Sequence, residues 1–343
     1  MSGKLRIVEP ANNSAPAIKL VSFSEIRLGN QRRYLVKGLI PRTGLTVVWG
    51  PPKSGKSFWT FDVAMHVALG WRYRDYRVHA GPVVYCAFEG QSGLEARVEA
   101  FRQRFLTDHQ EPPFYLVPIT LDLVADQRAL ITAIEDVLGD ERPVMVNLDT
   151  LNRSLRGSES RDEDMAAYIR ATDAIREAFA CAVVIVHHCG IDGTRPRGHT
   201  SLTGACDAQL SVIRDGADNV IVTVEEMKDG PNGTVIASRL EQVDVGIDED
   251  GEAITSCVVV PTEVPRPATA DPRERLSKNQ TTMFSILHDA GGCLSKDDWY
   301  TKAHEAGLGN RRKADLHDFR TSLVAKRLVF ETSRGFRIRH DGP

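Results

Sequence analysis

Gly50-Pro51-Pro52-Lys53-Ser54-Gly55-Lys56-Ser57 is the stretch that decides the fold of this 343-residue chain. It fits the spacing G-x-x-x-x-G-K-[ST], in which backbone N–H groups close around phosphate groups at the start of a helix. The apolar run from Leu45 to Trp49 predicts a strand before it, and Phe58 to Ala68 predicts a helix after it. Strand, loop and helix in this order are the context that a phosphate loop requires. We therefore expect the chain to bind a nucleoside triphosphate, ATP, and to hydrolyse it.

The phosphate-loop pattern assigns roles to particular residues. Lys56 is expected to reach the β- and γ-phosphates, and the Ser57 hydroxyl to ligate Mg²⁺. Asp149 is the expected second metal ligand, because it is a carboxylate that ends the apolar run from Val144. The alternative is that Asp149 only caps the following turn. The residues expected to hold the nucleotide are Gly50, Pro51, Pro52, Lys53, Ser54, Gly55, Lys56, Ser57 and Phe58.

The general base must come from another strand, because Thr150 follows Asp149 at a position where many phosphate-loop hydrolases place a glutamate. Glu89 is the candidate, since it follows the apolar run from Val83 to Phe88. Ligands of open α/β sheets bind at the carboxyl ends of such strands. Glu159, in the polar loop after the Asp149 strand, is a second candidate, and a plain surface role for Glu89 is the remaining alternative.

Short β-branched runs alternate with helical patterns from Gly44 to about Val260, which predicts an α/β domain around a mostly parallel sheet. Asp162 to Ala180 has apolar residues at helical spacing and predicts a crossover helix. After His188 the turn signals Asp215-Gly216 and Asp229 to Gly233 predict an antiparallel extension of the sheet. The expected core strands are apolar nearly throughout, as strands covered on both faces are, and comprise Leu45 to Trp49, Val83 to Phe88, Phe114 to Val117, Val144 to Asp149 and Ala182 to His188.

A second, smaller domain is expected at the C-terminal end. Residues 261–276 hold four prolines without periodicity and predict a linker. After it the pattern predicts a helix around Met283, a helix opening at Ser295, a helix from about Ala314 to Lys326, and strands at Leu328 to Glu331 and Phe336 to Arg339. This order is typical of a winged helix-turn-helix. The expected division is a flexible segment over residues 1–20, an ATPase domain over 21–260, a linker over 261–276 and a winged-helix-like domain over 277–343.

Composition narrows the class of protein. An apolar content of 42% with 26% charged residues is ordinary for a folded globular protein and argues against a disordered or fibrous class. No apolar run is long enough to span a bilayer, so the cytoplasm is the expected location. The six cysteines form no CxxC pair and are expected to be reduced thiols. A zinc site is the alternative for one group, although its spacing is irregular: His187, His188, Cys189, His199 and Cys206.

Taken together, residues 20–240 resemble the RecA-like hexameric ATPases, and among them the RepA-like replicative helicases of plasmids, phages and mobile elements. The resemblance implies a RecA-like phosphate-loop fold and a hexameric ring that acts on DNA. It also implies that Glu89 polarises the attacking water and that His188 senses the γ-phosphate. The residues that carry it, besides the phosphate loop, are Tyr34 to Ile40, Ala87 to Gly90 with Arg97, Leu148 to Arg153, and Val186 to His188.

Ring ATPases of this kind complete each site with a cation from the neighbouring subunit. The segment Glu226 to Gly233 is similar to the hairpin on which DnaB-type helicases carry a Lys-x-Arg pair, with Lys228 at the Arg position. Glu226 replaces the first lysine, and lysine lacks the planar fork of arginine. Arg197 and Arg214 remain alternatives for this cation, as does a plain turn charge at Lys228.

The C-terminal module is basic, because residues 311–339 hold nine Lys or Arg against three acidic residues. A third helix in a major groove and Arg334 on a wing would suit DNA, with phosphate contacts from Arg311, Arg312, Lys313, Arg320, Lys326 and Arg327. Docking of another protein is the alternative. The leading hypothesis is thus a ring-forming, DNA-dependent ATPase that unwinds DNA. The second is an ATP-switched DNA-binding regulator or loader, and a small-molecule phosphotransferase is disfavoured.

Overall fold

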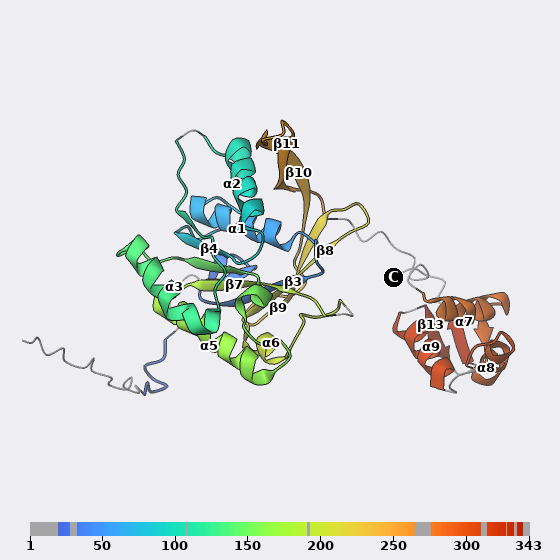
Figure 1. Cartoon of the computed structure of the whole chain (residues 1–343). Helices are drawn as coiled ribbons and strands as arrows, with labels where there is room; N and C mark the ends of the chain where they lie inside the picture. Colours follow the sequence, from blue (N-terminus) through green and yellow to red (C-terminus); the bar gives the residue numbers. More distant parts are fainter. Residues whose placement is uncertain are drawn as a thin grey trace, which may run out of the picture. The chain divides into compact units, whose positions relative to one another are not determined.

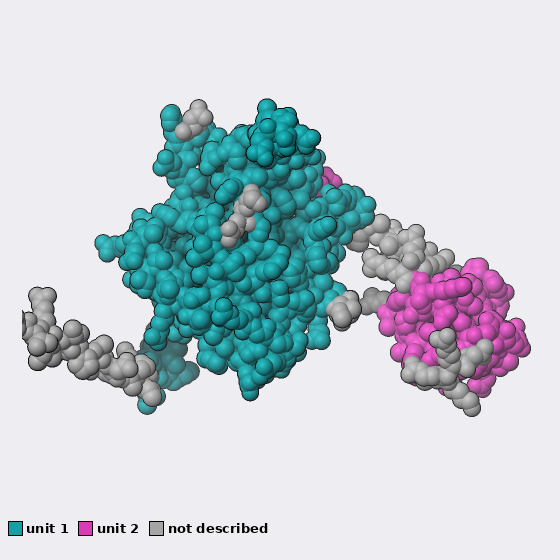
Figure 2. All heavy atoms as spheres, in the orientation of Figure 1, with its two compact units in different colours: residues 1–261 teal, residues 262–343 magenta. Residues whose placement is uncertain are grey.

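The computed structural model describes residues 20–27, 33–107, 109–190, 193–264, 276–309, 314–326, 328–332 and 335–338. The chain divides into two compact units, residues 1–261 and 262–343, which Figure 2 distinguishes by colour. The segment expected to be flexible, residues 1–20, lies outside the described residues except for Leu20, and so does most of the expected linker. Among the described helices, none is long and apolar enough to cross a membrane.

A nine-stranded sheet organises the first unit, with the strand order β11-β10-β9-β8-β3-β7-β6-β4-β5. A separate two-stranded ribbon, β1 (Tyr34–Val36) and β2 (Ile40–Pro41), precedes it in the chain. The strands of the large sheet are β3 (Gly44–Gly50), β4 (Val83–Ala87), β5 (Phe114–Val117), β6 (Met145–Asp149), β7 (Ala182–His188), β8 (Ala208–Arg214), β9 (Val220–Met227), β10 (Val235–Ile247) and β11 (Ala253–Pro261).

The five strands predicted as the core are present and run parallel to one another, which confirms the α/β fold class with a mostly parallel sheet. The expectation for the strands after His188 needs a correction. β8 pairs in parallel with β3, and only β9, β10 and β11 add antiparallel strands. The reason is that the loop after β7 and helix α6 (Ser201–Ala205) return the chain to the start of β3 before β8 begins.

Helices cover both faces of this sheet, as Figure 1 shows. The side chains of β3 alternate between them: Val48 packs with α1 and α2, whereas Val47 and Trp49 pack with α3 and α5. A strand buried on both faces has to be apolar along its whole length, and this explains the run that precedes the phosphate loop. The helices of this unit, with α6, are α1 (Lys56–Leu69), α2 (Gln91–Phe105), α3 (Leu123–Leu138), α4 (Leu151–Ser154) and α5 (Asp162–Phe179).

The second unit has its own core around the fully buried Trp299, whose indole N–H donates to the carbonyl of Met283 at 2.8 Å. Its strands form a small sheet in the order β12-β14-β13. The two-residue β12 was not predicted, because a run this short carries no periodicity. The elements are α7 (Lys278–Asp289), β12 (Cys293–Leu294), α8 (Lys296–Glu305), α9 (Ala314–Ala325), β13 (Val329–Thr332) and β14 (Gly335–Ile338).

Serines begin the first two helices of this unit. Ser277 forms a capping box with Gln280 at the start of α7, and the Ser295 hydroxyl accepts from the Asp298 amide at 3.1 Å at the start of α8. Such caps satisfy backbone N–H groups that have no partner inside the helix. Several cations of the expected DNA-binding surface lie outside the described residues, namely Arg311, Arg312, Lys313, Arg327, Arg334 and Arg339.

Helix α1 carries a buried carboxyl group in its middle, at Asp62. Asp62 is 1% exposed, with a guanidinium nitrogen of Arg74 at 3.8 Å and Nδ1 of His66 at 3.7 Å. Burial raises the pKa of Asp62 from 3.8 to about 7, and the nearby Arg74 offsets only part of this effect. The ionised form is therefore disfavoured in the folded protein.

Asp62→Asn should remove a pH-dependent loss of stability. The pKa of Asp62 is higher in the folded state than in the unfolded state. The free energy of unfolding of the wild type therefore falls as pH rises from 3.8 to about 7, and it stays lower at higher pH. Relative to the variant, we expect the free energy of unfolding of the wild type to fall by about 3 kcal/mol between about pH 5 and pH 8.5. Urea unfolding of both proteins at the two pH values measures this. Titration of His66 is common to both proteins, so a difference that stays constant with pH would contradict the prediction.

Candidate nucleotide-binding site

The phosphate loop connects the end of β3 to the start of α1 and lies against the neighbouring strand β8. A Cβ atom added to Gly50 would stand 2.0 Å from the carbonyl oxygen of Val212, so no other residue fits there. Gly55 is the residue before α1 and has a φ of 95°, a conformation that other residues rarely adopt. The loop thus presents the N-terminus of α1, where backbone N–H groups favour an anion.

Lys56 begins α1 and folds back over the loop. Its ammonium group donates to the carbonyl oxygens of Gly50 at 3.0 Å and Pro51 at 2.7 Å. Burial lowers the pKa of Lys56, whereas the nearby Asp149 carboxylate acts in the opposite direction. The cation is therefore held beside the loop by backbone groups that a phosphate oxygen can replace.

Asp149 ends β6 beside Lys56. Its carboxylate does not cap the following helix. It accepts from the Tyr85 hydroxyl at 2.7 Å, and no side chain caps α4. Burial raises the pKa of Asp149, while hydrogen bonding from Tyr85 and Ser57 lowers it. A buried carboxylate next to a hydroxyl offers the oxygen ligands that Mg²⁺ prefers, so the residues present fit this metal.

Glu89 and Glu159, the two candidates for the base, have different surroundings. Glu89 is half-exposed, with the Thr150 hydroxyl at 3.4 Å and a guanidinium nitrogen of Arg153 at 3.7 Å. Glu159 is buried, pairs with Arg197 and accepts from the Asn152 amide at 2.8 Å. Its carboxylate is thus occupied in fixing the loop after β7, whereas that of Glu89 faces the nucleotide side.

His187 and His188 end β7 and face opposite sides of the sheet. His187 is fully buried, and its Nε2 lies 2.8 Å from the carbonyl oxygen of Arg197. His188 lies opposite Gly50 in the parallel pairing of β3 and β7. Burial and then the charge of Lys56 lower the pKa of His188, so its imidazole is neutral near pH 7 and can both donate and accept hydrogen bonds.

A cavity of about 570 Å³ brings these side chains together. Arg97 and Thr150 were not expected in the site from the sequence, and Arg214 was expected only as a cation for another subunit. Arg97 lies over the ring of Phe58 with 4.1 Å between guanidinium carbon and ring centre, and Arg214 ends β8 next to the loop. The lining comprises Pro52, Lys53, Gly55, Lys56, Ser57, Phe58, Glu89, Gly90, Arg97, Asp149, Thr150, His188 and Arg214.

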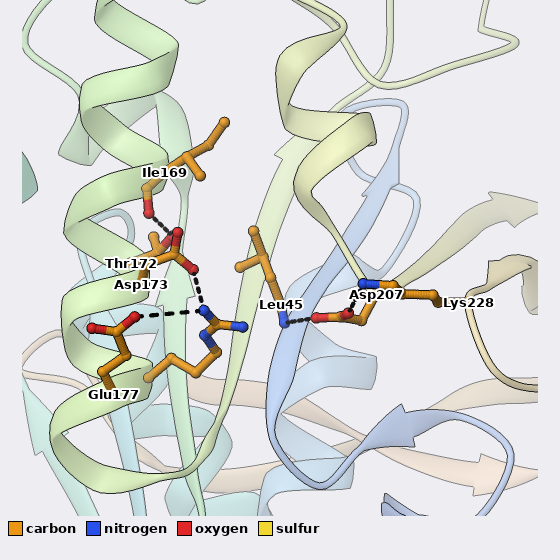
Figure 3. Close-up of polar contacts among 8 residues, drawn as sticks. Leu45, Ile169, Thr172, Asp173, Glu177, Asp207 and Lys228 are labelled. Atoms are coloured by element: carbon orange, nitrogen blue, oxygen red, sulfur yellow. Dashed lines mark hydrogen bonds and ion pairs between the residues drawn. The ribbon is translucent and has the colours of Figure 1, made fainter. Parts of the chain in front are cut away.

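Lys228 lies at the other end of the sheet. Its ammonium group is 3.4 Å from one oxygen of Asp207, whose second oxygen accepts from the Leu45 amide at 3.0 Å, as Figure 3 shows. Leu45 is at the start of β3, whereas the phosphate loop follows its end. Lys228 therefore does not reach the cavity of its own chain. Of the three candidate cations, only Arg214 lines that cavity.

The described residues contain no group of three or more His, Cys, Asp or Glu side chains that could hold a metal ion such as zinc. His187 and His188 face opposite sides of the sheet, and the Cys206 thiol donates to the carbonyl of Thr203 at 3.2 Å. The strand geometry thus separates the residues that their sequence had placed side by side.

Comparison with known proteins identifies one family. A family model described as an AAA domain matches residues 18–194. No curated protein matches the chain. Solved structures do match, among them the crystal structure of the RadB recombinase, which is 19% identical and has a TM-score of 0.44 over 60% of this chain and 90% of that one.

Gly50→Ala should destabilise the first unit, because its Cβ would collide with the backbone of β8 and backbone atoms cannot yield as a side chain can. We expect a loss of about 3 kcal/mol in the free energy of unfolding, measured with urea. Gly93→Ala is the matched control, since an added Cβ there meets nothing within 4 Å on helix α2. The control should gain about 0.5–1 kcal/mol. Equal stability of the two variants would show that β8 does not constrain the loop.

Proposed function

Because the chain belongs to the AAA domain family, we propose that it binds ATP with Mg²⁺ in the cavity at the phosphate loop and hydrolyses it. One observation carries the proposal. Lys56, the Ser57 and Asp149 pair, Glu89 and His188 come from four different segments of the sequence and line a single cavity. This shared lining supports the proposed roles of a cation for the phosphates, a pair of metal ligands and a carboxylate base.

Each side chain then has a part in the reaction. Lys56 exchanges its two carbonyl partners for phosphate oxygens. Ser57 and Asp149 would hold Mg²⁺, which offsets negative charge on the β- and γ-phosphates. Glu89 orients a water molecule and accepts its proton, and the neutral His188 donates a hydrogen bond to the γ-phosphate. Arg97 and Arg214 add positive charge on the cavity wall.

We further propose that the ATPase is a DNA-dependent motor of the RepA-like helicase type. Exposed arginines lie in the loop that follows α4, each near a carboxylate. Arg156 is 87% exposed and 3.9 Å from Asp122, and Arg161 is 66% exposed and 3.2 Å from Glu163. Arg153, on α4, lies 3.7 Å from Glu89. A phosphate backbone that attracts these arginines would compete for Arg153 and alter the surroundings of the base. This contact offers a direct route by which DNA stimulates hydrolysis.

A ring, and by the family resemblance a hexamer, would add a cation from the neighbouring subunit to those that line the cavity of each chain. Lys228 is 69% exposed at the end of the sheet opposite the phosphate loop. In a head-to-tail arrangement this end of one subunit can meet the nucleotide side of the next. Lys228 is therefore proposed as the cation given to the neighbouring site, with Arg197 held by Glu159 and Arg214 acting within its own chain.

The alternative function is an ATP-switched DNA-binding regulator or loader. It is favoured by the second unit, whose three helices and small sheet have the order of a winged helix and whose sequence is basic. We propose that this unit contacts duplex DNA, with Arg320 on α9 among the described cations. A regulator would bind such DNA in a nucleotide-dependent way without separating its strands.

Glu89→Gln should retain ATP binding and lose turnover, because the amide keeps the shape of the side chain but accepts no proton. We expect a fall in kcat of about 100-fold or more with a nearly unchanged Kd for a fluorescent ATP analogue. Lys56→Ala should weaken nucleotide binding itself. Glu135→Gln, on the exposed face of α3, is the control and should hydrolyse ATP as the wild type does. Normal turnover in Glu89→Gln would remove Glu89 from the mechanism.

The same assay, run with forked DNA and alongside native mass, tests the motor. Hydrolysis stimulated by DNA, strand separation and a ring-sized mass support the helicase. Slow hydrolysis with nucleotide-dependent binding to duplex DNA and no strand separation supports the regulator. Hydrolysis in a monomer that no DNA affects would contradict the motor while leaving the ATPase in place, and the absence of any DNA binding would contradict the regulator as well.

Mixing two inactive variants tests whether Lys228 acts on a neighbouring subunit. Lys228→Ala lacks the cation but has an intact phosphate loop, and Lys56→Ala has the reverse. In a randomly mixed ring about a quarter of the interfaces combine both intact parts, so activity should reappear on mixing. The control is Arg239→Ala, which removes a cation at an exposed position on β10. This variant is used in place of Lys228→Ala and should be active without mixing. No recovery on mixing would exclude a shared site at Lys228.

A further inference from the structure

A second cavity, of about 450 Å³, lies at the C-terminal end of α1. We call it the basic recess; its lining comprises Arg33, Tyr34, Lys37, Gly70, Arg72, Arg77, Val78 and His79. Helix α1 has 14 residues, so the recess is about 20 Å from the phosphate loop, and no residue lines both cavities. It is therefore a separate feature of the first unit.

Backbone pairing holds the two sides of the recess in place. Val36 and Val78 form an antiparallel bridge, the Lys37 amide donates to the carbonyl of Arg77 at 2.9 Å, and the His79 amide donates to that of Leu35 at 2.8 Å. Leu35 and Val36 are fully buried and anchor this pairing in the core. The side chains of Lys37 and Arg77 are thus brought together by the fold, although 40 positions separate them in the sequence.

The recess is strongly positive, because four cations line it and no carboxylate does. Lys37 and Arg77 are exposed and have no acidic partner in the described part of the chain, and Arg72 donates only to the carbonyl of Asp75, at 2.7 Å. Arg33 has Asp229 at 3.7 Å, with both side chains largely exposed. The end of α1 accounts for about half a negative charge. The cations exceed by far what this helix end needs.

We infer that the basic recess binds the phosphodiester backbone of a nucleic acid strand. Three of the four cations are arginines, whose planar guanidinium groups match phosphate oxygens in pairs. A pocket for a free nucleotide would need a wall of apolar side chains for the base, whereas Tyr34 and Val78 are the only apolar side chains of more than a hydrogen atom among the eight lining residues, beside four cations. This inference goes beyond the proposed motor, because it adds a DNA contact that is separate from the ATPase cavity. The contact suits a strand or duplex that does not lie at the nucleotide-binding side.

Salt dependence of DNA binding tests this directly. Fluorescence anisotropy with labelled single-stranded and duplex oligonucleotides is measured over a series of salt concentrations for the full chain. Arg72→Glu combined with Arg77→Glu should reduce the slope of log K against log salt by about two and weaken binding at low salt by about 10- to 100-fold. Arg128→Glu combined with Arg142→Glu changes net charge equally on the α3 side of the unit and should keep the wild-type slope.

The outcomes separate this inference from the proposed function. A reduced slope without DNA-stimulated hydrolysis supports the recess and counts against the motor, and DNA stimulation with unchanged slopes does the reverse. Titration with inorganic pyrophosphate tests whether the recess binds a small phosphate compound instead. If Arg72→Glu with Arg77→Glu loses pyrophosphate binding but keeps the wild-type salt slope for DNA, the inference is overturned. A lower native mass of the variant with unchanged slopes would also overturn it, in favour of a contact between copies. Hydrolysis without DNA should stay at the wild-type rate in both double variants.

Discussion

β3 pairs in parallel with β7 on one side and with β8 on the other, and the remaining features of the site depend on this register. Gly50 on β3 stands opposite His188 on β7, and Ala87 on β4 stands opposite Asp149 on β6. Parallel strands in register end together, so residues that follow separate strands meet at one edge. The same closeness leaves no room for a Cβ at Gly50 against the backbone of β8.

Burial then sets the electrostatics of that edge. It lowers the pKa of Lys56 and raises that of Asp149, and each of these groups partly offsets the change in the other. Neither charge is fully compensated by the protein alone. Triphosphate and a divalent cation, the ligands proposed for this site, carry the complementary charges. Burial also keeps His188 neutral, which suits a group that contacts phosphate without adding a fixed charge.

The two ends of the sheet have different chemistry. At the carboxyl end of the parallel strands lies the cavity with the phosphate loop, and at the other end lie Lys228 and Asp207. Asp207 ties Lys228 to the start of β3 through the Leu45 amide, so the exposed cation is attached to the same strand that supports the loop. The basic recess adds positive charge at the far end of α1. β3 and α1 thus connect the phosphate-loop cavity, Lys228 and the basic recess.

Local sequence was sufficient for the elements whose signals are local. The phosphate loop, the buried strands β3, β4, β6 and β7, and helix α5 are set by residue spacing and by burial, and both leave a pattern along the chain; β5 was expected to be covered on both faces, but it is a half-buried edge strand. Asp149 and Glu89 could be proposed because each stands at the carboxyl end of such a strand, whereas the role proposed for His188 is what the family resemblance implies. Tertiary structure alone decided the direction of β8, and with it the place of Arg214, because the residue pattern of a strand does not record whether its neighbours run parallel or antiparallel to it. It also decided that Glu159 holds Arg197, and that Lys37 and Arg77 share a recess, because these contacts join residues far apart in sequence through packing that no local pattern records.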